Sequence, residues 1–252
     1  MPYSPIRKLA PYADAAKRNG VKVYHLNIGQ PDIKTPECAL EAIRNVDREI
    51  LEYSPSDGYL SLRTKMVKYY AEYGIYLSPD EIIITAGGSE AVLFAFLACL
   101  DPGDEIIVTD PFYANYMAFA ISVGSVIKSV KTRIEDGFRL PSVEEFEAKI
   151  TPRTKAILIC NPNNPTGYLY TRKEMQRLRD IVRKHGLFLF SDEVYREFIY
   201  TGMPYISAFH LDGIEENVVL FDSVSKRYSE CGTRIGCLCT KNKSVHDAVM
   251  KF

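Results

Sequence analysis

The sequence lacks the features that would place a protein on nucleic acid or in a membrane. Its 252 residues carry a formal net charge of -1, which gives no electrostatic reason to expect nucleic acid or an anionic membrane surface. The longest apolar run, residues 91–100, is too short to span a bilayer. The first seven residues contain no apolar segment typical of a signal peptide. We therefore expect neither a nucleic-acid partner nor a membrane.

The sequence also lacks the cysteine spacing of a metal site. None of its six cysteines forms a C-x-x-C pair with another. Cys231, Cys237 and Cys239 lie close together, but their spacing does not match a zinc motif. We expect no metal and a reducing, cytoplasmic setting.

Short apolar runs alternating with amphipathic stretches dominate the chain from residue 81 onward, without internal repeats or low-complexity segments. The apolar runs predict strands at 81–85, 105–108, 125–130, 155–160, 187–190, 217–221 and 235–239. Helices are predicted between them, and two of these begin at capping boxes, Ser142 to Glu145 and Thr171 to Glu174. Continuously apolar strands that alternate with helices predict an α/β fold. We expect a mostly parallel central sheet with one antiparallel strand and helices on both faces.

The first 80 residues give weaker signals. Residues 1–20 contain three prolines and are predicted to form an arm outside the core. Residues 21–26 alternate on a period of two, which predicts a strand. Thr35 and Pro36 have the residue types of an N-cap and a first helical position. Apolar residues at helical spacing over 62–73 predict an amphipathic helix.

Glycines follow the first predicted strand of the sheet. In open α/β sheets, ligands bind beyond the carboxyl ends of the strands, so the residues there are candidate site residues. Gly87, Gly88 and Ser89 stand between that strand and a helix, where backbone N–H groups and the helix dipole suit a phosphate. The same glycines would also make an ordinary tight turn. They do not form the G-x-G-x-x-G pattern of dinucleotide-binding proteins.

Three further strand ends carry distinctive polar groups. Tyr113 follows the second strand, where it could stack on a flat heterocycle or cover the edge of the core. The asparagine-rich turn 161–167 follows the fourth. Asp192 follows the fifth, and a carboxylate there is costly unless it is paired. Its partner could be a cation of the protein or a ring nitrogen of a ligand.

The sixth strand ends at the most informative stretch of the chain. Ser223, Ser225 and Lys226 follow it, and Arg234 comes eight residues after the lysine. The lysine is either a surface charge or an amine that forms a Schiff base with a carbonyl group. The serines and the guanidinium would suit a phosphate. A ligand that meets both conditions has an aldehyde and a phosphate, and pyridoxal phosphate has both.

Together these residues resemble the fold-type-I pyridoxal-phosphate enzymes, in particular the class I/II aminotransferases of the aspartate aminotransferase type. The matching positions run in the family order along nearly the whole chain: Asn27 to Asp32, Tyr53 with Gly58, Gly87 to Ser89, Tyr113, Asn161 to Gly167, Asp192 with Tyr195, and Ser223 to Lys226 with Arg234 and Gly236. The N-P-x-N-P-T-G and S-x-S-K blocks are highly specific. The resemblance implies the three-layer large domain of that family.

The resemblance also implies roles for individual residues. Lys226 should be the Schiff-base lysine and, once displaced, the group that moves protons, and Asp192 should face the pyridine nitrogen. A charge pair at ~4 Å and an effective dielectric of ~20 contributes about 4 kcal/mol, which would keep that ring protonated as an electron sink. Tyr195 and Asn164 should hydrogen-bond the phenolic oxygen of the ring. We therefore take Lys226, Asp192 and Tyr195 as the candidate catalytic residues.

The remaining implied contacts concern the cofactor's phosphate, its ring and the substrate. The candidate cofactor-binding residues in this group are Gly87, Gly88, Ser89, Tyr113, Ser223, Ser225 and Arg234. The family tyrosine at Tyr53 reaches the phosphate of a neighbouring subunit, which implies a homodimer. Gly29 and Asn164 are expected to bind the substrate.

The expected function is aminotransfer between an amino acid and a 2-oxo acid in amino-acid metabolism. A lyase or decarboxylase on the same fold, or a non-catalytic cofactor-binding module, remains an alternative. The expected domains are an arm and small-domain segment at 1–45, the large cofactor-binding domain at 46–240 and the start of a connecting helix at 241–252. Because the family's C-terminal small domain and its carboxylate-binding arginine are expected to be missing, we predict low activity for this chain.

Overall fold

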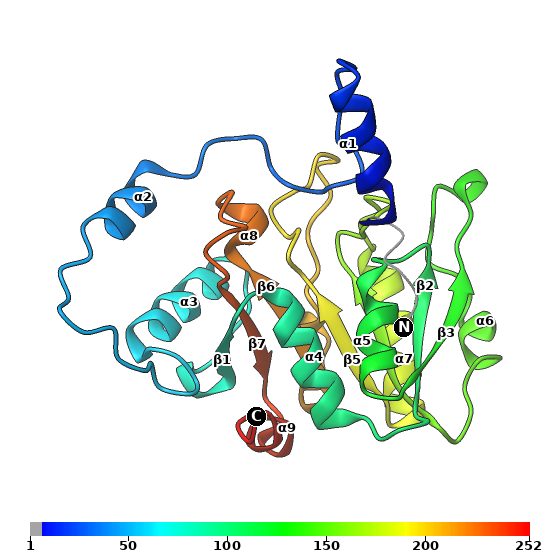
Figure 1. Cartoon of the computed structure of the whole chain (residues 1–252). Coiled ribbons are helices and arrows are strands. Elements are labelled where there is room, and N and C mark those ends of the chain that lie inside the picture. The colour runs from blue at the N-terminus through cyan, green and yellow to red at the C-terminus, as the bar shows by residue number, and fades with distance from the viewer. Residues whose placement is uncertain (1–6) are drawn as a thin grey trace.

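A computed structural model describes residues 7–252 as a twisted sheet covered by helices on both faces (Figure 1). The first residues of the predicted arm, 1–6, lie outside the described residues. The strands are β1 (Ile82–Thr85), β2 (Glu105–Asp110), β3 (Val126–Lys131), β4 (Thr154–Cys160), β5 (Phe188–Asp192), β6 (Val218–Ser223) and β7 (Gly236–Thr240). The α-helices are α1 (Ala10–Arg18), α2 (Glu37–Arg44), α3 (Leu60–Glu72), α4 (Gly88–Cys99), α5 (Asn115–Ser122), α6 (Val143–Glu147), α7 (Arg172–His185), α8 (Val224–Arg227) and α9 (Lys243–Val249).

All seven predicted strands from residue 81 onward join one sheet. Their order across it is β1-β7-β6-β5-β4-β2-β3. β7 runs antiparallel to both of its neighbours, and the other pairs are parallel. The prediction of a mostly parallel sheet with one antiparallel strand is therefore confirmed. The parallel strands place their carboxyl ends at one edge of the sheet, and β7 begins at that same edge.

The strands are continuously apolar because both faces of the sheet are buried. Alternate residues of each strand point into two separate cores, as Ile157 and Ile159 do on one face and Ala156 and Leu158 on the other. The first core also contains residues of α3, α6 and α7, whereas the second contains residues of α4, α5 and α9. This two-sided burial is the condition under which a parallel sheet is stable.

The two capping boxes identified in the sequence start helices as predicted. The Ser142 side chain accepts a hydrogen bond from the backbone N–H of Glu145 at the start of α6. The Thr171 side chain does the same for Glu174 at the start of α7. Each interaction satisfies a backbone donor that the first turn of a helix leaves without an intrahelical partner.

Two predictions for the N-terminal part are wrong. Residues 21–26 form no strand; they are irregular and mostly exposed, because no sheet edge pairs with them. Thr35 does not cap α2, since Pro36 occupies the N-cap position. The Thr35 hydroxyl instead donates to the carbonyl oxygen of Ser229, at 2.7 Å. Neither α1 nor α2 contains a buried residue, and α2 stands away from the sheet in Figure 1.

Within residues 7–252, we find no helix with the length and apolar character needed to cross a bilayer.

Candidate active site

A cleft of about 430 Å³ opens at the edge where the parallel strands end. It brings together residues from five separate strand ends and from the irregular segment before α2. Eleven of the predicted site residues line it: Gly29, Gly88, Ser89, Tyr113, Asn164, Asp192, Tyr195, Ser223, Ser225, Lys226 and Arg234. The cleft is therefore the candidate active site.

Lys226 reaches the cleft from the single helical turn α8. The preceding strand β6 ends at Ser223, whose side chain accepts from the backbone N–H of Ser225 at 3.0 Å and so starts this turn. The Lys226 Nζ donates to the carbonyl oxygen of Gly29 at 2.7 Å. It also lies 3.8 Å from the Sγ of Cys231. The amine is thus held between residues 223–234, which we call the lysine loop, and the N-terminal segment at Gly29.

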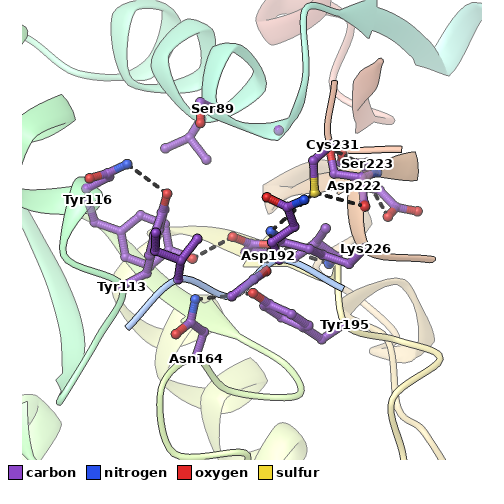
Figure 2. Close-up of a pocket in the computed structure, with 18 of the residues that line it drawn as sticks. Ser89, Tyr113, Tyr116, Asn164, Asp192, Tyr195, Asp222, Ser223, Lys226 and Cys231 are labelled. Atoms are coloured by element: carbon purple, nitrogen blue, oxygen red, sulfur yellow. Dashed lines mark hydrogen bonds between the residues drawn. The ribbon is translucent and has the colours of Figure 1, made fainter. Parts of the chain in front are cut away.

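Asp192, the last residue of β5, presents a carboxyl group to the cleft (Figure 2). The Tyr116 hydroxyl donates to its Oδ2 at 2.6 Å, and the backbone N–H of Val194 donates to Oδ1 at 3.3 Å. Burial raises the pKa of Asp192 to about 6, although these two hydrogen bonds act in the opposite direction. Burial is therefore the largest influence on the pKa of this carboxyl group.

Tyrosines and an asparagine surround this carboxyl group. Asn164 Nδ2 donates to the Tyr195 hydroxyl at 3.4 Å, and burial raises the pKa of Tyr195 far above its ordinary value. The Tyr113 hydroxyl accepts from Asn115 at 2.7 Å. The Tyr113 ring meets the Tyr116 ring edge to face, with centroids 5.4 Å apart. Figure 2 shows Tyr113 on one side of Asp192 and Tyr195 on the other.

An anion-binding arrangement lies at the start of α4. Gly88 and Ser89 form the first turn of this twelve-residue helix, where free N–H groups favour a negative charge. The Arg234 guanidinium lies beside them and donates to the carbonyl oxygen of Ala86 at 3.1 Å. Ser223 also lines the cleft. Helix dipole, guanidinium and hydroxyl groups together suit a phosphate.

Gly87 lies behind this arrangement and does not line the cleft. Its φ of +91° favours glycine, and a Cβ there would come within 2.3 Å of Arg234 Nη2. Glycine is needed for the guanidinium to occupy its position. Tyr53 also does not line the cleft, and its side chain is fully exposed, with a relative accessibility of 102%.

Several residues at the site were not singled out from the sequence. The sequence predicts for Tyr116 only a place in a helix between two strands, and its contact with Asp192 spans 76 positions. For Cys231 the sequence suggests only a metal ligand, a role that its spacing does not support. Signals for both existed: a second tyrosine three residues after Tyr113, and a thiol five residues after Lys226.

A buried ionic network of Asp222, Arg196 and Arg227 anchors the start of the lysine loop. Asp222 accepts hydrogen bonds from Arg196 at 2.9 Å and from Arg227 at 2.7 Å. Burial alone would raise the pKa of Asp222, but the two guanidinium groups lower it below its ordinary value. Arg227 directly follows Lys226, so the network fixes the turn that carries the lysine.

This combination of fold and cleft defines a class of protein. A mostly parallel α/β sheet whose strand ends surround a lysine amine, a buried carboxyl group and an anion-binding helix start is the fold-type-I arrangement. The chain belongs to the family described as aminotransferase class I and II, which it matches over residues 21–252.

Individual relatives agree with this assignment. The chain is 35% identical to an aspartate aminotransferase of Thermotoga maritima, over all of this chain and 67% of that protein. The crystal structure of the T. maritima enzyme superposes on this chain with a TM-score of 0.93. The superposition covers all of this chain and 67% of the crystallised chain. An aspartate/prephenate aminotransferase of Thermus thermophilus is 36% identical over 88% of this chain and 57% of that protein. An aromatic-amino-acid aminotransferase of Thermococcus litoralis is 34% identical over 93% and 60%, respectively. The chain thus spans 57% to 67% of the length of these curated relatives.

Members of this family are pyridoxal phosphate enzymes. The residues present fit that cofactor, since the cleft offers an amine, a carboxyl group and an anion-binding helix start within one space. Lys226 would bind its aldehyde carbon, Asp192 its ring nitrogen, and Ser89, Ser223 and Arg234 its phosphate.

Proposed function

We propose that this chain carries the cofactor site of a pyridoxal-phosphate-dependent aminotransferase, which moves an amino group between an amino acid and a 2-oxo acid. The observation that carries the proposal is the position of the Lys226 amine. It lies in one cleft with the Asp192 carboxyl group and with the start of α4. A surface lysine would need neither of these neighbours.

The cofactor, when bound, supplies an aldehyde and a ring that withdraws electrons from the substrate. The chain supplies orientation and proton transfer. Asp192 would place a negative charge beside the ring nitrogen, and Tyr195 and Asn164 would hydrogen-bond the phenolic oxygen of the ring. The Lys226 Nζ would accept a proton from the substrate Cα and return it, a general acid–base step.

The proposal includes a substrate class and a homodimer. Relatives are named for aspartate, prephenate and aromatic amino acids, so we take these as the first candidates for the substrate. Tyr53 supports a homodimer, because a fully exposed aromatic side chain that does not reach its own cleft is available to a neighbouring subunit. The substrate contact assigned to Gly29 also remains a proposal; its carbonyl oxygen holds the Lys226 amine.

The domain division and location are proposals too. We place the arm and small-domain segment at 1–45, the large domain at 46–240 and the start of a connecting helix at 241–252. The sheet supports the middle assignment because its strands span 82–240. The six free cysteines support a reducing, cytoplasmic location.

Cofactor loading tests the central assignment. Pyridoxal phosphate is added to the purified chain, followed by borohydride, and peptide mass spectrometry locates the reduced adduct. We expect it on Lys226, with none at that position in Lys226→Ala. Lys243→Ala is the matched control, because Lys243 is exposed and pairs with Asp247 on α9. An adduct distributed over surface lysines, equal in both variants, would sink the assignment.

The reaction type is tested by a single turnover of the loaded chain. Aspartate and aromatic amino acids are each mixed with the loaded protein, and the products are separated. Transfer predicts one equivalent each of pyridoxamine phosphate and the matching 2-oxo acid. Release of ammonia or carbon dioxide with regenerated pyridoxal phosphate would instead indicate a lyase or a decarboxylase. Loading without any product would indicate a non-catalytic binding module.

A further inference from the structure

Cys231 is the thiol that meets the candidate catalytic amine. Its Sγ lies 3.8 Å from Lys226 Nζ and donates to the carbonyl oxygen of Ser225 at 3.2 Å. Both side chains line the cleft, so a small solute that enters the cleft reaches both groups. Figure 2 shows Cys231 and Lys226 on the same side of Asp192.

The other cysteines are placed differently. Cys160, Cys237 and Cys239 are buried in the sheet, and burial raises the pKa of Cys160 and of Cys239 well above the ordinary value. Burial also raises the pKa of Cys99, to about 12, which makes its thiol inert. Cys38 is exposed on α2, away from the cleft. Cys231 is thus the cysteine that combines access from the cleft with a neighbouring amine.

We propose that Cys231 and Lys226 form a peroxide-sensitive pair that closes into a covalent S–N bond and thereby removes the amine from use. Hydrogen peroxide oxidises the thiol to a sulfenic acid and is itself reduced to water. The nitrogen lone pair of Lys226 then attacks the sulfur. An S–N bond forms, the S–O bond breaks, and the hydroxide leaves as water with a proton from the amine. Thiol, amine and one peroxide give a sulfenamide and two waters, so the protein loses two hydrogens.

The geometry favours this outcome over further oxidation. A sulfenic acid condenses with a nitrogen nucleophile when one is adjacent, and Nζ is already in contact with the sulfur. Lysine has a flexible four-carbon side chain, so the amine can close the remaining distance without movement of the backbone. The inference deepens the proposed function, because it concerns the same lysine, yet the bond itself needs no cofactor.

Intact-mass and peptide mass spectrometry of the cofactor-free chain test the pair. After brief treatment with hydrogen peroxide, we expect the intact mass to fall by two hydrogens and a peptide that joins Cys231 to Lys226 to appear. Dithiothreitol should reverse both changes. Loading with pyridoxal phosphate before the peroxide should protect the pair, since the amine is then occupied. Peroxide treatment should likewise abolish the borohydride-trapped adduct on Lys226 until dithiothreitol is added.

Three variants identify the atoms involved. Cys231→Ser and Lys226→Ala should both lose the joined peptide, whereas Cys38→Ser should keep it, because that thiol is far from the cleft. Cys231→Ser should still be trapped by borohydride on Lys226, which separates this inference from the cofactor assignment. Oxidised Cys231 found only as an unlinked sulfinic acid, or in a disulfide with another cysteine, would overturn the inference.

Discussion

The Asp192 carboxyl group predicts a specific pH dependence of stability in the cofactor-free chain. Burial raises its pKa from 3.8 to about 6. The folded state therefore binds this proton more tightly than the unfolded state does. The contribution is most favourable at or below pH ~4 and is lost as the pH rises toward the folded pKa. A difference of about two pKa units corresponds to about 3 kcal/mol, at 1.36 kcal/mol per unit.

Asp192→Asn isolates this contribution. Asparagine has nearly the same shape, its side-chain oxygen can still accept the hydrogen bond from Tyr116, and it does not titrate. Free energies of unfolding are measured by urea titration of both proteins at intervals from pH 4 to pH 8. The other titrating groups largely cancel in the difference between the two proteins. We expect wild type to lose up to ~3 kcal/mol relative to the variant between pH ~4 and pH ~7.

The slope of that difference decides the question. A difference that is flat across the range would show that the carboxyl group is as well solvated in the folded state as in the unfolded state. If wild type instead gained stability relative to the variant as the pH rises, a positive charge, and not burial, would govern the pKa of Asp192. Either result would refute the assignment of burial as the largest influence on the pKa of this carboxyl group.

Three further substitutions test neighbouring parts of the site. Tyr116→Phe removes the shortest hydrogen bond to Asp192, worth about 1.5–3 kcal/mol. In the same urea titrations, the pH at which half of the stability contribution is lost should rise by about one unit or more. Asp222→Asn leaves two buried guanidinium groups without their carboxylate and should lower the free energy of unfolding by about 3–5 kcal/mol; a neutral outcome would contradict the ionic network. Gly87→Ala should displace the nearby guanidinium and weaken the binding of inorganic phosphate in calorimetry. Gly202→Ala is its control, because that glycine also has a positive φ but open space around it.

The sheet and most of the cleft could be predicted because their signals are local. Each β-branched run forms a strand where another strand can pair with it. Parallel strands then bring their carboxyl ends to one edge of the sheet. Ser89, Asp192 and Ser223 follow directly from this rule. The wrong strand at 21–26 shows the limit of the rule: alternation on a period of two describes a segment that can pair, and the chain offers it no partner.

Two of the contacts that the sequence did not reveal join segments far apart in the chain. A second tyrosine three residues after Tyr113 marks Tyr116 as a candidate, but the sequence does not show that its hydroxyl faces Asp192, 76 positions away. The pairing of Asp222 with Arg196, 26 residues before it, requires β6 to pack against the segment that follows β5. Such side-chain partners depend on the tertiary arrangement, whereas the residue types at strand ends do not.

The contact between Lys226 and Gly29 has a consequence for the N-terminal segment. Residues 29–35 have no buried core of their own, and three hydrogen bonds tie them to the lysine loop: Lys226 to Gly29, Thr35 to Ser229, and Ser229 to Ile33. The first of these depends on a free amine. A bond to the Lys226 amine breaks its hydrogen bond to Gly29 and so loosens this segment. By thermodynamic reciprocity, a contact that anchors the segment makes a bond to the amine less favourable. Protease sensitivity within 21–35 would then report on the state of a lysine two hundred residues away in sequence.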